Sequence, residues 1–158
     1  ESYQQMVLGT ARSFVGNLED AQDITQEVFV EIFRSINTFR SESSLSTWIY
    51  RITITRSLNH IRREKRHKGP RLERALINND SPDKVLEEDD RKRILHSAIA
   101  TLPENQRIAF VLHNYKDLPY QDIAKIMNRS LSSVESLIFR ARKNLQKKLW
   151  TWYKKSRV

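Results

Sequence analysis

Apolar residues recur every three or four positions along most of this chain, which is the spacing of one face of an α-helix. The spacing predicts helices over residues 3–15, about 19–36 and about 45–67, with Gly16-Asn17 and a loop at 37–44 between them. The clearest apolar stripe, in the second helix, consists of Ala21, Ile24, Val28, Phe29, Ile32, Phe33 and Ile36. The first part of the chain is therefore predicted to be a small three-helix unit.

Residues 68–84 interrupt this pattern. They contain Gly69-Pro70 and the turn-prone run 78–83 (NNDSPD), and their few large apolar side chains cannot build a core. Helical spacing returns in an acid-rich segment that begins near Glu87, and again after Pro103. We interpret residues 68–84 as a linker and the remainder as a second helical unit.

The second unit ends in a short helix, a turn and a longer basic helix. Pro119 stands where the short helix can begin, Asn128 at a turn position that favours a left-handed residue, and Ser130 where the last helix needs an N-cap. The apolar stripe of the last helix consists of Val134, Leu137, Ile138, Ala141, Leu145 and Leu149. This pattern is typical of a helix-turn-helix, although helical hairpins that bind no DNA share the spacing.

Composition favours an all-α protein and removes several classes of site. Only three Gly and four Pro occur, and most of them lie between or at the starts of periodic segments. The absence of cysteine excludes disulfides and thiolate metal sites, and the four histidines lack metal-ligand spacing. No apolar run reaches the length of a membrane span, and no signal peptide is visible. We therefore expect a cytoplasmic protein with no metal and no cofactor.

The net charge of +9 is unevenly distributed. Residues 1–60 hold five Lys and Arg against seven Asp and Glu, whereas residues 61–158 hold 23 against 12. Most of the basic excess lies in residues 62–74 and 140–157, and the second run contains no acid. Such clusters indicate a polyanionic partner, with a solvated surface or attraction to membrane lipid as the alternatives.

The outward side of the second predicted helix is acidic. Its candidate binding residues are Asp20, Asp23, Gln26, Glu27 and Glu31. Asp23, Glu27 and Glu31 are spaced four residues apart, and like charges at this spacing weaken an isolated helix. A basic protein partner would relieve the repulsion, and a solvated face is the alternative. Nothing nearby indicates a catalytic pocket.

The third predicted helix mixes aromatic, hydroxyl, amide and arginine side chains. Aromatic rings stack on unpaired bases, hydroxyls and amides bond to base edges, and arginine neutralises phosphate. The candidates for binding melted DNA are Trp48, Tyr50, Thr55, Asn59, Arg62 and Arg63, with Thr53 and Ser57 as further hydroxyls. The alternative is that Trp48 belongs to the core, which is the commoner role of a lone tryptophan.

Candidates for binding duplex DNA lie on the solvent side of the last helix. They are Ser130, Ser132, Ser133, Glu135, Ser136, Phe139, Arg140, Arg142 and Lys143. Serine hydroxyls and helix N-terminal amides bind phosphate, a carboxylate accepts from cytosine, and arginine pairs with guanine. Phe139 fits either contact with a thymine methyl group or packing.

Taken together, these residues resemble the extracytoplasmic-function (ECF) group of bacterial sigma-70-family sigma factors over nearly the whole chain. Residues 20–29 (DAQDITQEVF) match the group's DAxDxxQExF block, and residues 47–52 (TWIYRI) match its TWLxRI block. The fourth conserved region is matched by Leu102-Pro103, Arg107, residues 120–124 (YQDIA) and residues 134–142 (VESLIFRAR). The order and separation of these blocks make the resemblance specific.

The resemblance implies two small helical domains, residues 1–67 and 85–158, joined by a flexible linker at 68–84. The first domain would bind the β′ clamp helices of RNA polymerase core through the acidic residues. It would also capture the melted minus-10 element through the third helix and the loop residues Ser41, Ser43 and Ser44. The second domain would dock on the β flap and read the minus-35 element of promoter DNA with the last helix.

The resemblance further implies a protein without enzymatic activity of its own, commonly held by an anti-sigma factor that is often membrane-anchored. Thr55 stands where ECF factors often have Asn, Asn128 replaces a turn Gly, and Glu135 replaces a frequent Lys or Arg. The first and last of these changes bear on the preference for the minus-10 and minus-35 sequences.

Two other classes of protein are alternatives to a sigma factor. A helix-turn-helix repressor or activator would bind duplex DNA without polymerase, and it would need neither the acidic second helix nor the aromatic third helix. A nuclease would need a carboxylate-metal or histidine constellation, which the sequence lacks.

Overall fold

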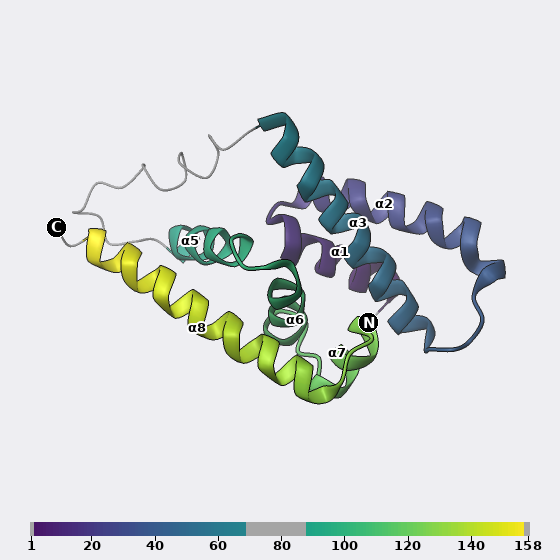
Figure 1. Ribbon diagram of the computed structural model, residues 1–158. Coiled ribbons are helices and arrows are strands. Elements are labelled where there is room, and N and C mark those ends of the chain that lie inside the picture. The colour runs from purple at the N-terminus through teal and green to yellow at the C-terminus, as the bar shows by residue number, and fades with distance from the viewer. Residues whose placement is uncertain (1, 69–87, 157–158) are drawn as a thin grey trace.

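The computed structural model describes residues 2–68 and 88–156, which contain seven α-helices, one 3₁₀ turn and no strand (Figure 1). The helices are α1 (Tyr3–Val15), α2 (Leu18–Ser35), α3 (Leu45–Lys68), α5 (Glu88–Ala100), α6 (Glu104–Asn114), α7 (Tyr120–Met127) and α8 (Leu131–Ser156), with η1 at Ile36–Thr38. The predicted all-α class is confirmed. The predicted linker, apart from Lys68 at the end of α3, lies outside the described residues.

The ends of the first two helices are fixed by local side chains. Ser2 and Gln5 form a reciprocal capping box at the start of α1, and the Asn17 side chain accepts from the Asp20 N–H at 2.9 Å at the start of α2. Between them, Gly16 ends α1 in the left-handed conformation, with its N–H donating to the Arg12 carbonyl. The break predicted at residues 16–17 therefore consists of the C-cap of α1 followed directly by the N-cap of α2.

Helices α1, α2 and α3 pack on one another around a shared apolar core. Phe14, Ile24 and Val28 are almost fully buried there. Three buried threonines have bonded hydroxyls, because each of the three donates to the carbonyl one turn earlier in its own helix. The bonds run from Thr10 to Met6, from Thr25 to Ala21 and from Thr53 to Ile49, at 2.7–2.8 Å.

The predicted inward stripe of α2 is wrong at its C-terminal end. Phe33 is 80% exposed and Ile36 is 43% exposed. Ile32 packs against the core, whereas Phe33 points about 100° further around the helix and away from it. Ile36 leaves the helix and begins η1.

The second group of helices is built around α6 and α8. Seven consecutive residues of α6, from Gln106 to Leu112, are buried, and α5, α6 and α7 all contact α8. Asn128 ends α7 with φ 53° and ψ 51°, and the Ser130 hydroxyl caps α8 by accepting from the Ser133 N–H at 3.1 Å. Both local predictions for the helix-turn-helix are confirmed.

The two groups of helices also touch each other (Figure 1). Helix α7 lies against α3, and α6 lies against α1. Arg107, on α6, is 6% exposed and donates to the Phe14 carbonyl at 3.1 Å, and its guanidinium lies 6.0 Å from the Phe14 ring centroid. Burial lowers the pKa of this guanidinium, while Glu104 raises it.

His96 of α5 packs against the end of α1. A Cβ atom added at Gly16 would lie 2.6 Å from His96 Nε2, closer than real contacts allow. Burial lowers the pKa of His96, and the nearby charge of Arg107 lowers it further. Neutral histidine is therefore favoured in this contact.

We predict that Gly16→Ala destabilises the protein and that Gly9→Ala does not. Gly16 has φ 80°, which costs an L-residue about 1–2 kcal/mol, and its new methyl group would collide with His96. Gly9 lies inside α1, where alanine is the better helix former, and its new methyl group would meet only the flexible end of Lys116. Urea unfolding of both variants measures the difference. A Gly16→Ala protein as stable as wild type would contradict this account of the α1 terminus.

Candidate nucleic-acid interface

Three of the predicted acidic residues of α2 lie beside basic side chains of α3, and two of them form ion pairs. Glu31 receives a hydrogen bond from Arg56, and Glu27 pairs with Arg63 at 3.7 Å, while His60 Nε2 lies 3.3 Å from Asp20 Oδ2. The ion pairs of Glu27 and Glu31 lessen the repulsion expected between these two carboxylates. Asp23 and Gln26 remain exposed.

The exposed face of α2 continues from these polar residues into apolar ones. Val30 is 48% exposed and Phe33 is 80% exposed. Asp23, Gln26, Val30 and Phe33 are separated by three, four and three residues, so they lie on one side of the helix. We call these four residues the α2 stripe. The sequence contained one signal for it, namely the adjacent apolar residues Ile32 and Phe33, which point about 100° apart on the helix.

One face of α3 carries most of the residues predicted to bind melted DNA. Trp48, Thr55, Asn59 and Arg62 have spacings that place them on the same side of the helix. Thr55 and Asn59 are exposed, and Arg62 donates to the Asn59 side chain at 3.0 Å. Trp48 is half-buried, with its ring 5.1 Å from that of Phe39. Its ring packs partly against the core, and the rest of the side chain remains accessible.

The sequence-based assignment of Tyr50 to this face is wrong in this structure. Tyr50 is 7% exposed and belongs to the apolar core, so its ring is not available to a base. Thr53 and Ser57 are also buried. Two residues beyond Trp48, a side chain lies about 200° around the helix, which places Tyr50 on the opposite, inner side. Arg63 lies at the edge shared with α2, where it pairs with Glu27.

A further cation on this face was missed. Arg51 follows Trp48 by three residues and precedes Thr55 by four, so it lies in the same row. Its Nε donates to the Ile126 carbonyl at 3.0 Å, and its NH2 donates to the Lys125 carbonyl at 2.6 Å. We call Trp48, Arg51, Thr55, Asn59 and Arg62 the α3 face.

The loop before α3 places its three candidate serines differently. Ser44 caps α3, because its hydroxyl accepts from the Thr47 N–H at 3.1 Å. Ser43 is half-buried and donates to the Ser44 carbonyl at 3.3 Å. Ser41 is exposed and has a positive φ of 57°. Of the three, Ser41 is therefore the most available to a partner.

The outer surface of α8 brings together nearly all the residues predicted for duplex DNA. Ser132, Ser136, Phe139 and Lys143 follow one another at spacings of four, three and four, directly opposite the buried stripe. The flanking residues Glu135, Arg140 and Arg142 are exposed as well. Ser133 is half-buried and accepts a bond from Arg129, and Ser130 is exposed but serves as the cap.

Phe139 does not pack into the core. It is 58% exposed, and Lys143 Nζ lies 4.7 Å from its ring centroid. A cation above the ring stabilises an aromatic side chain at a wet surface. Phe139 therefore does not serve as a packing residue within the described chain, and it lies on the exposed outer surface of α8.

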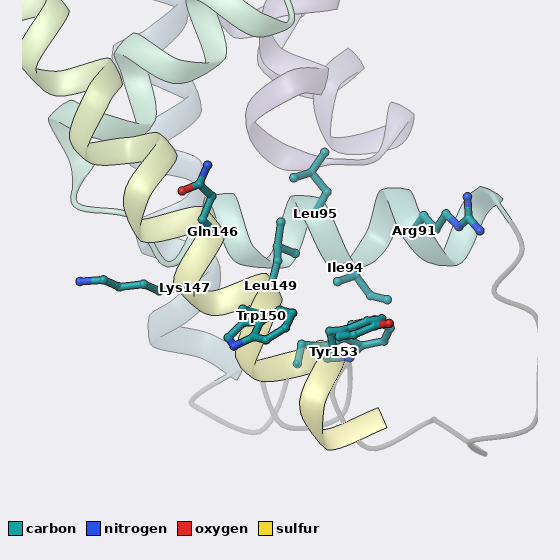
Figure 2. A pocket seen from close by; sticks show the side chains of 9 residues that line it. Arg91, Ile94, Leu95, Gln146, Lys147, Leu149, Trp150 and Tyr153 are labelled. Carbon is teal, nitrogen blue, oxygen red and sulfur yellow. The ribbon is translucent and has the colours of Figure 1, made fainter. Parts of the chain in front are cut away.

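A groove of about 960 Å³ lies between α5 and the C-terminal end of α8 (Figure 2). Ile94 and Leu95 line it from α5, and Leu149, Trp150 and Tyr153 line it from α8. Trp150 is 57% exposed and stacks on Tyr153. Exposed apolar surface of this kind is typical of a protein-binding groove.

Among residues 2–68 and 88–156, no helix combines the length and the apolar character that crossing a membrane requires. Within the same residues, no three His, Asp or Glu side chains gather closely enough to hold a metal ion.

Comparisons with known proteins identify the family of the chain. The sigma-70 region 2 family matches residues 1–67, and the sigma-70 region 4 family matches residues 92–145. The RNA polymerase sigma-H factor of Pseudomonas aeruginosa is 34% identical over 158 residues, covering 93% of this chain and 82% of that protein. The ECF RNA polymerase sigma-E factor of Haemophilus influenzae is 32% identical over 160 residues, covering 93% and 83%.

Solved structures show the same fold. The sigma factor RpoE in complex with the anti-sigma factor NepR from Bartonella quintana gives a TM-score of 0.64 at 20% identity, covering 93% of this chain and 91% of that one. CnrH in complex with the cytosolic domain of CnrY gives 0.66 at 19% identity, covering 94% and 83%. Fold, family matches and relatives lead to one conclusion: the chain belongs to the ECF group of the sigma-70 family of RNA polymerase sigma factors.

Proposed function

We propose that this chain binds RNA polymerase core through α2 and α8, and positions the enzyme on promoters through α3 and α8. The polymerase performs the chemistry, and the chain itself supplies the choice of start site. The observation that carries the proposal is the presence of three separate outward faces on one small helical protein. They are the α2 stripe, the aromatic and cationic α3 face, and the polar outer surface of a helix-turn-helix.

The α2 stripe has the geometry of a surface that docks on helices. Its residues alternate spacings of three and four, as in helices that pack side by side. The exposed Phe33 supplies a large apolar anchor, and Asp23 and Gln26 supply polar contacts beside it. This combination suits the β′ clamp helices. Asp20, Glu27 and Glu31 then hold α2 on α3 and support the stripe from behind.

The α5–α8 groove is the surface that best suits the β flap. It is apolar, it lies on the second group of helices, and the α8 residues that line it follow Lys143 in the chain. Docking there would leave the N-terminal half of α8 free to enter the major groove.

For promoter reading, we assign the minus-10 strand to the α3 face together with Ser41, and the minus-35 duplex to the outer surface of α8. Thr55 and Asn59 offer hydrogen-bonding groups to bases, and Trp48 offers a ring edge beside them. On α8, the amides near the Ser130 cap suit a phosphate, whereas Glu135, Phe139 and Arg140 lie where base edges would be reached.

We infer the same domain division from these roles: residues 1–67 as the region 2 domain, 68–84 as the linker and 85–158 as the region 4 domain. An anti-sigma factor is a further expected partner. Both structural neighbours described above are sigma factors held by such a protein.

Binding to core polymerase tests the first part of the proposal directly. Purified chain and core enzyme should co-elute from a sizing column at micromolar concentration. A chain that elutes alone under conditions where a related sigma factor co-elutes would contradict it and would favour a repressor or activator that acts on DNA by itself.

Gln26→Lys and Phe33→Ser should each weaken core binding without unfolding the protein. Both side chains are exposed, so their loss costs little stability, whereas loss of an aromatic anchor from an interface costs about 2 kcal/mol or more, roughly 30-fold in affinity. Gln4→Lys, an exposed glutamine of α1, is the matched control. Fluorescence titration of core enzyme measures the affinities. Equal affinities for Gln26→Lys and Gln4→Lys would remove the α2 stripe from the interface.

Glu135→Gln should change the base preferred at one position of the minus-35 element. A carboxylate only accepts hydrogen bonds, whereas an amide also donates, and a specific base contact is worth about 1–3 kcal/mol. Asp117→Asn is the control, because it removes one charge from the same group of helices at a turn residue with φ 53° that Asn tolerates. Transcription from a randomised minus-35 library gives the preference. An unchanged preference would show that Glu135 does not contact a base.

A further inference from the structure

The outer surface of α8 continues beyond the residues assigned to DNA. An exposed row on this surface, with spacings of four, four, three and four residues, consists of Phe139, Lys143, Lys147, Trp150 and Lys154. One contact occurs twice in the row. Lys143 Nζ lies 4.7 Å from the Phe139 ring centroid, and Lys154 Nζ lies 5.3 Å from that of Trp150. Aromatic rings and lysines therefore share one side of α8 almost to its end.

The C-terminal part of this row lies too far along α8 to read DNA. From the Ser130 cap to Trp150 the helix rises about 30 Å, at about 1.5 Å per residue. A recognition helix contacts base edges with its N-terminal residues, and the major groove is only about 12 Å wide. The rings and lysines beyond Lys143 therefore need another explanation.

We call Lys147, Trp150, Tyr153, Lys154 and Lys155 the C-terminal patch. All five side chains are exposed. The Tyr153 ring stacks on that of Trp150, with the two centroids 5.7 Å apart. Since Trp150 already has a stacked ring and an ammonium group beside it, it is poorly placed to stack on a nucleic-acid base.

The surroundings of the C-terminal patch are positively charged. Residues 140–157 contain eight Lys and Arg and no acid. Across the groove, α5 begins with three acidic residues that are followed at once by three basic ones, so its first six residues add no net charge. One of these acids, Glu88, pairs with Lys92 at 3.3 Å. The C-terminal patch therefore attracts an anionic partner.

The combination of groups suits the surface of an anionic bilayer. Tryptophan and tyrosine favour the membrane–water interface, because each joins an apolar ring to a polar group. Lysine stems lie along apolar surface while their ammonium groups reach the phosphates of the head groups. Ile94, Leu95 and Leu149 line the adjacent groove and extend the apolar surface beside the rings (Figure 2). A nucleic acid would use the lysines and leave this apolar surface in water.

We propose that the C-terminal patch binds the surface of anionic phospholipid membranes, with Trp150 and Tyr153 at the level of the head groups and the three lysines on their phosphates. The end of α8 lies on the bilayer and does not cross it. This binding goes beyond the function assigned above and needs neither polymerase nor promoter. The two rings also line the groove assigned to the β flap, so one chain cannot offer them to lipid and to polymerase at once.

Binding of the full chain to vesicles, measured by co-sedimentation, tests the proposal. The probes are vesicles of equal parts phosphatidylglycerol and phosphatidylcholine, and vesicles of phosphatidylcholine alone. A lysine close to an anionic surface contributes about fivefold in affinity, so the three lysines should favour the anionic vesicles by about a hundredfold. Equal binding to both kinds of vesicle, or binding to neither, would overturn the proposal.

The double variant Lys154→Gln/Lys155→Gln should bind anionic vesicles about twentyfold more weakly than wild type. Its control, Arg34→Gln/Arg40→Gln, removes the same charge from two exposed positions, at the end of α2 and in the loop before α3. The end of α2 and the end of α8 lie on opposite sides of the molecule (Figure 1). The control should lose less than about threefold, because the attraction decays within a Debye length. Equal losses would show that total charge, and not the C-terminal patch, holds the chain.

The double variant Trp150→Ala/Tyr153→Ala should bind anionic vesicles about tenfold more weakly, because apolar contact with the lipid is lost. This loss should persist at raised salt, which screens the lysines but not the rings. Tyr3→Ala is the control, since Tyr3 of α1 is 44% exposed and Tyr153 is 38% exposed. An unchanged affinity of the double variant for vesicles would contradict the proposal.

The same double variant distinguishes lipid from nucleic acid. Its affinity for a mixed-sequence duplex DNA, measured by anisotropy, should equal that of the wild type. A loss of affinity for DNA as large as the loss for vesicles would make the patch a nucleic-acid contact and reject the lipid site. Circular dichroism establishes that each variant is folded. Because no polymerase is present, failure here leaves core binding and promoter choice to be judged by their own experiments.

Discussion

Each helix that we assign to a partner has one face fixed in the apolar core, so it can bind only through the opposite face. In α2, Ala21, Ile24 and Val28 are fully buried, and the α2 stripe lies on the other side. In α8, Val134 and Ala141 are fully buried, and the polar outer surface lies opposite. This constraint places the proposed polymerase-binding and DNA-reading roles on different surfaces, and it explains how a chain of 158 residues offers several of them.

The contact between the two groups of helices involves backbone carbonyls at helix ends. Arg51 donates to the carbonyls of Lys125 and Ile126 at the end of α7, and Arg107 donates to the Phe14 carbonyl at the end of α1. Arg107 is buried by this contact, whereas Arg51 stays exposed at the surface.

Sequence reasoning predicted the features that depend on nearby residues. The helix ends agree with the structure within about one residue where a cap marks them, and Asn128 and Ser130 have the conformations expected. It failed at Phe33 and Tyr50, because the apolar Phe33 was expected to face inward and the aromatic Tyr50 to face DNA. Their angular positions around the helix place Phe33 outside and Tyr50 inside. It could not find the ion pairs between α2 and α3, or the bonds of Arg51. Those contacts join residues distant in the chain, and helical spacing carries no information about which faces meet.

The most direct test of the account is run-off transcription by core RNA polymerase with and without the purified chain, on a library of promoter sequences. The account predicts that the chain makes the core enzyme start at defined positions. Upstream of these positions, the templates should share preferred bases in both the minus-35 and minus-10 elements. Transcription that remains unselective with the chain present, under conditions where a related sigma factor directs defined starts, would contradict the central claim.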